Sequence, residues 1–239
     1  MIPSAETLLM LAVVGLYIYD SALLLHCNEG VLLPKGKDRW SLGLGSHSVG
    51  IFGKELYIPN PFLMHRPLFR LSWKFEGSEA STPWSPPRNA YGTLVPMIWS
   101  IAIALFILLP LGFFTRLGDR ILVPALLLIF ANVSIALLWI WFNRATLHLS
   151  RQRFAALAFE SVICPPFSLN LIRHLSLGIP VDEDLVLAAR RLQAPRDWDE
   201  ARAALLTRLD MALEGEDPES ERFKLMRERR KMLSRGNAE

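Results

Sequence analysis

The sequence predicts an integral membrane protein that is mainly α-helical, with three transmembrane helices, a small antiparallel β insertion between helices 1 and 2, and a C-terminal helical cytoplasmic domain. The 239 residues are 51% hydrophobic, and the mean hydropathy of +0.27 is high for a soluble protein. The apolar residues are also concentrated, because 27 uncharged residues separate Arg88 from Arg116 and 23 separate Arg120 from Arg144. At ~1.5 Å per residue, each run can cross the ~30 Å core of a bilayer.

The first predicted transmembrane helix covers residues 1–27. Between Thr7 and Cys27 its only charge is the carboxylate of Asp20. The alternative is a cleaved signal, but no Lys or Arg precedes the apolar run and no small-x-small cleavage site follows it. We therefore expect the run to be retained as a helix.

Asp20 is the most informative residue of this helix, because an ionised carboxylate in hydrocarbon is costly. Counting back from Cys27 at the cytoplasmic boundary places it ~10 Å deep, at ~1.5 Å per residue. Two roles stay open: a carboxylate that packs helices together, and an ionisable group that handles a proton or an ion. The residues predicted to form an intramembrane polar cluster are Tyr17, Asp20, Ser21, Ser100, Asn132 and Ser134.

Residues 28–90 are predicted to form a cytoplasmic β-rich segment. From Phe69 to Phe75 apolar and polar residues alternate, which is the period-two pattern of a strand with one buried face. Shorter apolar runs punctuated by Pro and Gly predict further strands at 30–33, 40–44 and 55–58. We expect one small antiparallel sheet on the inner membrane surface, connected irregularly through 78–87 to the second span.

The second and third transmembrane helices are predicted at 91–115 and 121–143, joined by an outer turn at 116–120. Membrane-surface helices are expected over 144–180, with the first continuing directly from the third span through 144–153. A break is predicted at Cys164-Pro165-Pro166, since proline restricts the residue before it and favours the first turn of a new helix. Cys164 is therefore a hinge or, alternatively, a reactive thiol near Arg173 and His174.

Residues 181–239 are predicted to form a helical cytoplasmic tail. Acidic residues precede each of its apolar segments, as is favourable at helix N-termini. The last helix has a thin apolar stripe of Phe223, Met226 and Leu233, so we expect it to contribute to association more than to folding. Its predicted partner-binding residues are basic: Arg227, Arg229, Arg230 and Lys231.

The distribution of positive charge predicts the orientation. Eight Lys or Arg lie in residues 28–90 and sixteen lie after residue 143, whereas the N-terminal run has no basic residue before it. The positive-inside rule then places the N-terminus outside and the C-terminus in the cytoplasm. We expect the protein in a bacterial inner (plasma) membrane, with Cys27 and Cys164 as reduced thiols.

The sequence contains no HExxH, GxSxG, P-loop or paired CxxC motif, and its histidines lack metal-ligand spacing. We therefore expect no metal and no other cofactor. After residue 143 the sixteen basic residues are balanced by fifteen acidic ones, which excludes a strongly basic nucleic-acid-binding domain. The favoured function is a non-catalytic membrane scaffold or accessory subunit of a membrane complex, with a protein partner at the cytoplasmic face. The alternative is a small membrane enzyme or an oligomeric transporter that uses Asp20, and this alternative involves a homo-oligomer.

Overall fold

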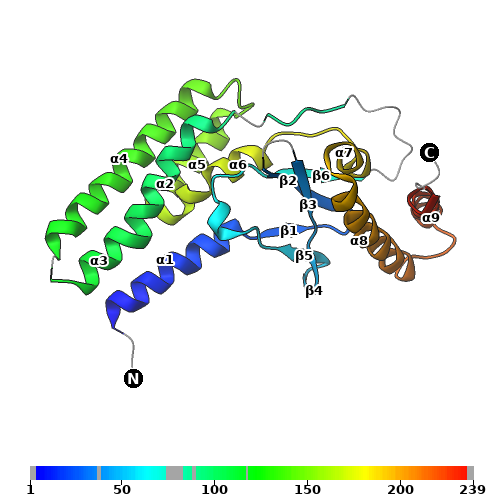
Figure 1. The fold of residues 1–239 in the computed structure, drawn as a ribbon, viewed down its shortest axis with the longest axis horizontal. Coiled ribbons are helices and arrows are strands. Elements are labelled where there is room, and N and C mark those ends of the chain that lie inside the picture. The colour runs from blue at the N-terminus through cyan, green and yellow to red at the C-terminus, as the bar shows by residue number, and fades with distance from the viewer. Residues whose placement is uncertain (1–3, 37–38, 74–82, 88–89, 117, 236–239) are drawn as a thin grey trace. The chain divides into compact units, whose positions relative to one another are not determined.

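The computed structural model describes residues 4–36, 39–73, 83–87, 90–116 and 118–235. The protein is mostly helical, at 63%, with small antiparallel sheets (Figure 1). The chain divides into two compact units, and each is built from separate stretches of sequence. Unit 1 comprises residues 1–22, 58–67 and 87–180, and unit 2 comprises residues 23–57, 68–86 and 181–239.

Two long apolar helical stretches dominate unit 1. The first contains η2 (Gly92–Leu94), α2 (Val95–Ile103), the π-helix η3 (Ala104–Leu108) and α3 (Leu109–Phe114), and the second is α4 (Asp119–Asn143). Both stretches are long and apolar enough to cross a membrane, and α2 packs against α4 (Figure 1).

The π-helix lies where the sequence disfavours α-helical hydrogen bonds. Pro110 has no N–H, and in an α-helix its ring would clash with the carbonyl of Phe106, which lies in η3. The stretch therefore widens over Ala104–Leu108 and returns to α-helix at Leu109.

Helix α1 (Ala5–Ser21) is shorter than the predicted span of 1–27. The Ser4 hydroxyl caps its start by accepting from the Thr7 N–H, and Ala22 is extended at its end. The next residues form strand β1 (Leu23–Leu25), in which Leu25 is fully buried. Seventeen residues give α1 a length of about 26 Å. Asp20 thus lies in the last turn of α1, not two turns inside a longer helix.

The helix expected to continue through 144–153 does not form as one element, so this prediction was wrong. Helix α4 ends at Asn143, and His148 adopts a left-handed φ of 51° in the turn that follows. Helix α5 (Arg151–Ile163) then starts at Ser150, whose hydroxyl accepts from the Arg153 N–H. After Cys164 the chain forms the 3₁₀ helix η4 (Pro165–Asn170) and then α6 (Leu171–Leu177).

Unit 2 contains two three-stranded antiparallel sheets, where the sequence predicted one. The first sheet has the order β1, β5 (Lys54–Tyr57) and β4 (Ser46–Ile51). The second has the order β3 (Arg39–Gly43), β2 (Glu29–Lys35) and β6 (Phe69–Ser72). The sheets approach closely at Gly43, where a Cβ would lie 2.5 Å from the Tyr57 hydroxyl. The described part of the predicted strand at 69–75 is β6 and Trp73, and Lys74 and Phe75 lie outside the described residues, as do residues 78–82 of the predicted connection.

The three tail helices complete unit 2. They are α7 (Leu185–Leu192), α8 (Pro195–Glu214) and α9 (Glu221–Arg235). Asp184 caps α7 by accepting from two backbone N–H groups, as its position before the apolar run predicts. The tail packs on the sheets through contacts of α7 with β2 and β3.

Helix α9 is held more firmly than its thin apolar stripe predicts. Met226 and Leu233 are 1% and 5% exposed, and α9 packs against α8. The guanidinium of Arg202 on α8 donates to the carbonyls of Leu233 and Ser234, with N–O distances of 2.6 and 2.8 Å. These contacts satisfy acceptors that are left unpaired at a helix C-terminus, so α9 belongs to the folded unit.

Candidate functional site

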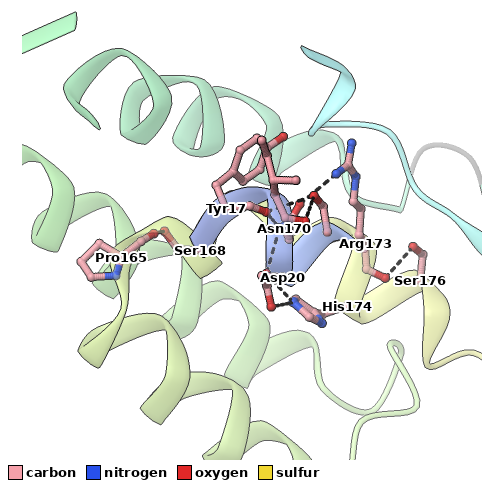
Figure 2. Close-up of polar contacts among 10 residues, drawn as sticks. Tyr17, Asp20, Pro165, Ser168, Asn170, Arg173, His174 and Ser176 are labelled. Atoms are coloured by element: carbon pink, nitrogen blue, oxygen red, sulfur yellow. Dashed lines mark hydrogen bonds and ion pairs between the residues drawn. The ribbon is translucent and has the colours of Figure 1, made fainter. Parts of the chain in front are cut away.

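The last turn of α1 brings the Asp20 carboxylate against η4 and α6 (Figure 2). Asn170 Nδ2 donates to Asp20 Oδ2 at 2.8 Å, and His174 Nε2 lies 3.1 and 3.0 Å from the two carboxylate oxygens. The Asp20 side chain is only 10% exposed. A carboxylate this buried requires polar partners, and here an amide and an imidazole supply them.

A buried arginine extends this group. Arg173 is 3% exposed, and its guanidinium donates to Asn170 Oδ1 at 3.0 Å and to the backbone carbonyl of Asn60 at 2.8 Å. Asn170 therefore stands between the negative Asp20 and the positive Arg173, donating to one and accepting from the other. We call Asp20, Asn170, Arg173 and His174 the α1–α6 cluster. It joins α1, the segment before η1 (Pro61–Leu63) and α6.

Tyr17 and Ser21, also predicted for the polar cluster, lie on α1 next to Asp20. The Tyr17 hydroxyl donates to the backbone carbonyl of Pro61, and the Tyr17 carbonyl accepts from Asn170 Nδ2 at 3.4 Å. The buried Ser21 hydroxyl lies 3.0 Å from the carbonyls of Tyr17 and Ile18 in its own helix. Tyr17 thus takes part in holding α1, whereas Ser21 is satisfied locally.

The three predicted partners on the other spans do not meet Asp20. Asn132 donates to the Leu128 carbonyl of its own helix at 2.8 Å, and Ser134 is exposed. Ser100 is half-buried on α2, and within the described residues no hydrogen bond joins it to Asp20. The prediction paired Asp20 with the neighbouring spans, but Asp20 lies at the helix end and finds its partners after the Pro165 break.

A sequence signal for these partners exists. Asn170, Arg173 and His174 are spaced i, i+3 and i+4, which puts their side chains on one face of a helix. This polar face follows the paired prolines that start η4. The sequence analysis considered Arg173 and His174 only as neighbours of Cys164, and it assigned no role to Asn170.

Cys164 occupies the hinge between α5 and η4. Its N–H donates to the Glu160 carbonyl at 2.9 Å and so ends α5. Burial raises the pKa of the Cys164 thiol, and the nearby negative charge of Asp20 adds to that effect. A raised pKa leaves less thiolate at neutral pH, which disfavours the reactive-thiol interpretation. Cys27, in unit 2, and Cys164 are both free thiols.

A small cavity of about 200 Å³ lies beside the α1–α6 cluster. His174 lines it together with Arg153 and Glu160 of α5. Arg153 is held against Gly178, whose carbonyl is 3.4 Å from Arg153 Nη1 and where a Cβ would lie 2.6 Å from the guanidinium. The imidazole of His174 therefore contacts Asp20 and also lines a cavity of mixed polar and apolar character.

The predicted partner-binding residues lie on α9 in unit 2. Arg229 forms an ion pair with the buried Asp184, and Arg230 forms one with Asp210. Arg227 and Lys231 are exposed. The predicted basic patch is therefore partly used to hold α9 in place.

A groove of about 210 Å³ opens between α7, α8 and α9. Its lining combines apolar side chains with arginines, and among the described residues no acidic side chain lines it. The lining residues are Val186, Leu187, Arg190, Trp198, Arg202, Arg229, Met232 and Leu233.

Comparison with protein-family models, with curated proteins and with solved structures finds no match for this chain. Within the part of the chain that the structure describes, no three His, Cys, Asp or Glu side chains gather closely enough to hold a metal ion.

Proposed function

We propose that this chain is a non-catalytic membrane scaffold or accessory subunit, with cytoplasmic elements that bind a protein partner. One observation carries the proposal. Residues 23–57 and 68–86 fold with residues 181–239 into unit 2, although both candidate spans lie between them in the sequence. Segments that fold together must lie on the same side of a membrane. Two crossings, by Gly92–Phe114 and by Arg120–Asn143, satisfy that requirement.

The exposed side chains of the helices support insertion into lipid. On α4, Leu127, Leu138 and Phe142 are 66%, 57% and 79% exposed, and on α1 Leu11 is 61% exposed. Large apolar side chains along a whole helix face are unfavourable in water but match hydrocarbon. We propose α1 as the third span, because its length of about 26 Å approaches the ~30 Å bilayer core.

The orientation that we propose has unit 2 in the cytoplasm and the N-terminus outside, in a bacterial inner membrane. Most of the basic residues belong to the segments of unit 2 or follow α4, which agrees with the positive-inside rule. Asp20 then lies at the cytoplasmic end of α1, where its hydrogen bonds to Asn170 and His174 fasten the helix to α6.

The partner surface that we propose is the groove between α7, α8 and α9. Its arginines and the exposed Lys231 favour an acidic partner segment, and its apolar floor favours one apolar side chain in that segment. Met232 and Leu187, which line the groove, are 65% and 49% exposed and supply apolar contact area.

Gentle purification of the tagged full-length protein tests the scaffold proposal. A protein should co-purify in a fixed ratio, and Arg190→Glu, at an exposed position that lines the groove, should release it without changing the unfolding midpoint. The matched control is Arg196→Glu, an equal charge reversal at an exposed position of α8 outside the groove. A lone homo-oligomer with no protein partner contradicts the scaffold function.

A second candidate is a membrane enzyme or oligomeric transporter in which Asp20 ionises as part of its function. The cavity of about 200 Å³ beside His174 favours it, because it gives the Asp20–His174 pair a polar space next to the membrane. Asp20→Asn keeps hydrogen bonding but removes ionisation, whereas Asp20→Leu removes both. If Asp20 only packs helices, Asn retains assembly and activity and Leu loses assembly. Loss of activity in a fully assembled Asn variant supports the ionisable role.

A further inference from the structure

A groove of about 440 Å³ runs along the side of unit 1 between α1, the turn after η1 and the stretch formed by α2 and η3. Its wall exposes only apolar atoms. The volume lies in the range of about 300–1,000 Å³ that is typical of small-molecule sites. Among the side chains that line it are Val14, Ile18, Phe62, Trp99, Ile103 and Phe106.

The groove is a consequence of two local features. The π-helix η3 carries Phe106, whose ring meets the Tyr17 ring edge-on with centroids 5.9 Å apart. The Tyr17 hydroxyl is directed to the Pro61 carbonyl, which removes its polar group from the groove. Tyr17 therefore contributes an apolar ring to the groove, while its hydroxyl donates to the backbone.

The dimensions of the groove match one leaflet of a bilayer. Along α2 and η3 its lining extends from Trp99 to Ile107, which corresponds to about 12 Å at ~1.5 Å per residue. Half of a ~30 Å hydrocarbon core is ~15 Å. The end marked by Trp99 is the one near the start of α2.

Polar groups lie at this end of the groove. The His65 ring packs on Trp99 with centroids 5.7 Å apart, and within the described residues the buried His65 Nδ1 has no hydrogen-bond partner. Burial, together with the charges of Arg66 and Arg173, lowers the pKa of His65, so the imidazole is neutral at pH 7. Arg66 thus brings a positive charge beside the His65 ring, which packs on Trp99 of the groove.

We propose that the groove binds one acyl chain of an anionic phospholipid from the cytoplasmic leaflet, with the lipid phosphate near the positive charge of Arg66. This inference rests on the proposed membrane insertion. The wholly apolar wall selects a hydrocarbon chain, and the basic end selects a negative headgroup, which is abundant in the cytoplasmic leaflet. A helix of a second protein satisfies the apolar wall but gives no reason for the basic end.

Fluorescence quenching by brominated phospholipids tests this site in vesicles that contain the full chain. Trp99 lines the groove, and its emission is identified by difference from Trp99→Phe. We expect brominated phosphatidylglycerol to quench Trp99 at about fivefold lower mole fraction than brominated phosphatidylcholine, the effect of one basic residue near the headgroup. Arg66→Gln should abolish this preference while quenching by both lipids persists.

Two substitutions on α1 separate groove binding from general contact with lipid. Val14→Phe fills the groove and should reduce quenching of Trp99, whereas Leu11→Phe, at an exposed position outside the lining, should leave it unchanged. Equal quenching by both lipids, or equal behaviour of the two variants, overturns the proposal.

Trp141, which is 39% exposed on α4, reports insertion separately. If Trp141 is quenched but Trp99 is protected from both lipids, the helices are inserted and a protein segment covers the groove, so the lipid site is overturned alone. If neither tryptophan is quenched, the membrane placement itself fails and the lipid site fails with it.

Discussion

Arg173 in unit 1 and Arg208 in unit 2 are both buried, but the groups that stabilise their charged guanidinium differ. Arg173 donates to the neutral amide of Asn170 and to the Asn60 carbonyl, and the same amide donates to Asp20. Arg208 forms an ion pair with the Glu55 carboxylate directly and also donates to the carbonyls of Glu29 and Gly45 at 3.1 and 2.9 Å.

The difference predicts how each unit responds when its arginine is lost. In unit 2, removal of Arg208 takes the opposite charge of this ion pair away from the Glu55 carboxylate, which is only 14% exposed. In unit 1, removal of Arg173 takes a donor away from two neutral acceptors, Asn170 Oδ1 and the Asn60 carbonyl. Burial also lowers the pKa of Arg208 to about 10, which reflects the cost of keeping that charge inside unit 2.

Arg208→Ala should have the largest effect, lowering the stability of unit 2 by ~3–5 kcal/mol, because it breaks the ion pair of a carboxylate that is largely buried. Chemical denaturation of the full chain in detergent measures this. The control is Arg230→Ala, which removes the exposed ion pair with Asp210 and should change little. A small effect of Arg208→Ala would mean that water reaches Glu55.

Met226→Ala tests whether α9 is part of unit 2. Met226 is 1% exposed, so truncation should cost ~2–5 kcal/mol, whereas Met232→Ala, at a position 65% exposed, should cost far less. The same denaturation experiment compares the two variants. Equal losses of stability in the two variants would mean that α9 is only loosely held, as its thin apolar stripe predicts.

Arg173→Ala should destabilise unit 1 by ~1–3 kcal/mol, less than Arg208→Ala destabilises unit 2, because the groups left behind are neutral. The unfolding midpoint of unit 1 measures this effect. It is followed by the protection of a cysteine introduced on α1 from chemical labelling. If Arg173→Ala lowers stability as much as Arg208→Ala does, the charge of Arg173 stabilises the Asp20 carboxylate even though the Asn170 amide lies between them.

The smallest expected effect is a pH dependence from His65. Its pKa is lowered in the folded protein by burial and by the charges of Arg66 and Arg173, so the unfolded chain binds more protons. Stability is therefore fully present above the ordinary histidine pKa of ~6.5 and decreases as the pH falls below it. His65→Gln should flatten this part of the stability profile, and the exposed His26→Gln should not. An unchanged profile in His65→Gln contradicts this assignment.

The sequence was sufficient for the elements that depend on local patterns. The two long uncharged runs predicted the helical stretches Gly92–Phe114 and Arg120–Asn143, and alternation predicted β6. The proline pair after Cys164 predicted the break before η4. Each of these signals lies within the segment that it describes.

The sequence was insufficient where distant pairing decides the local structure. Leu23–Leu25 has the composition of a membrane span but becomes β1, because β5 pairs with it and buries Leu25. The partners of Asp20 are separated from it by about 150 residues, so its contacts were not predicted from the sequence. Association of the tail with the sheets was also missed, because nothing local distinguishes a tail helix that packs on strands from one that stands alone.

The placement of residues 23–57 and 181–239 on the same side of a membrane is the central claim, and two insertions of one reporter test it most directly. Phe52 is fully exposed between β4 and β5, so an enzyme active only outside the cytoplasm can be inserted after it, and in a second fusion after Glu239. We predict that the reporter is inactive in both fusions and that a cytoplasmic reporter is active in both. Activity of the external reporter at one position and not at the other would contradict the folding of these segments into one unit.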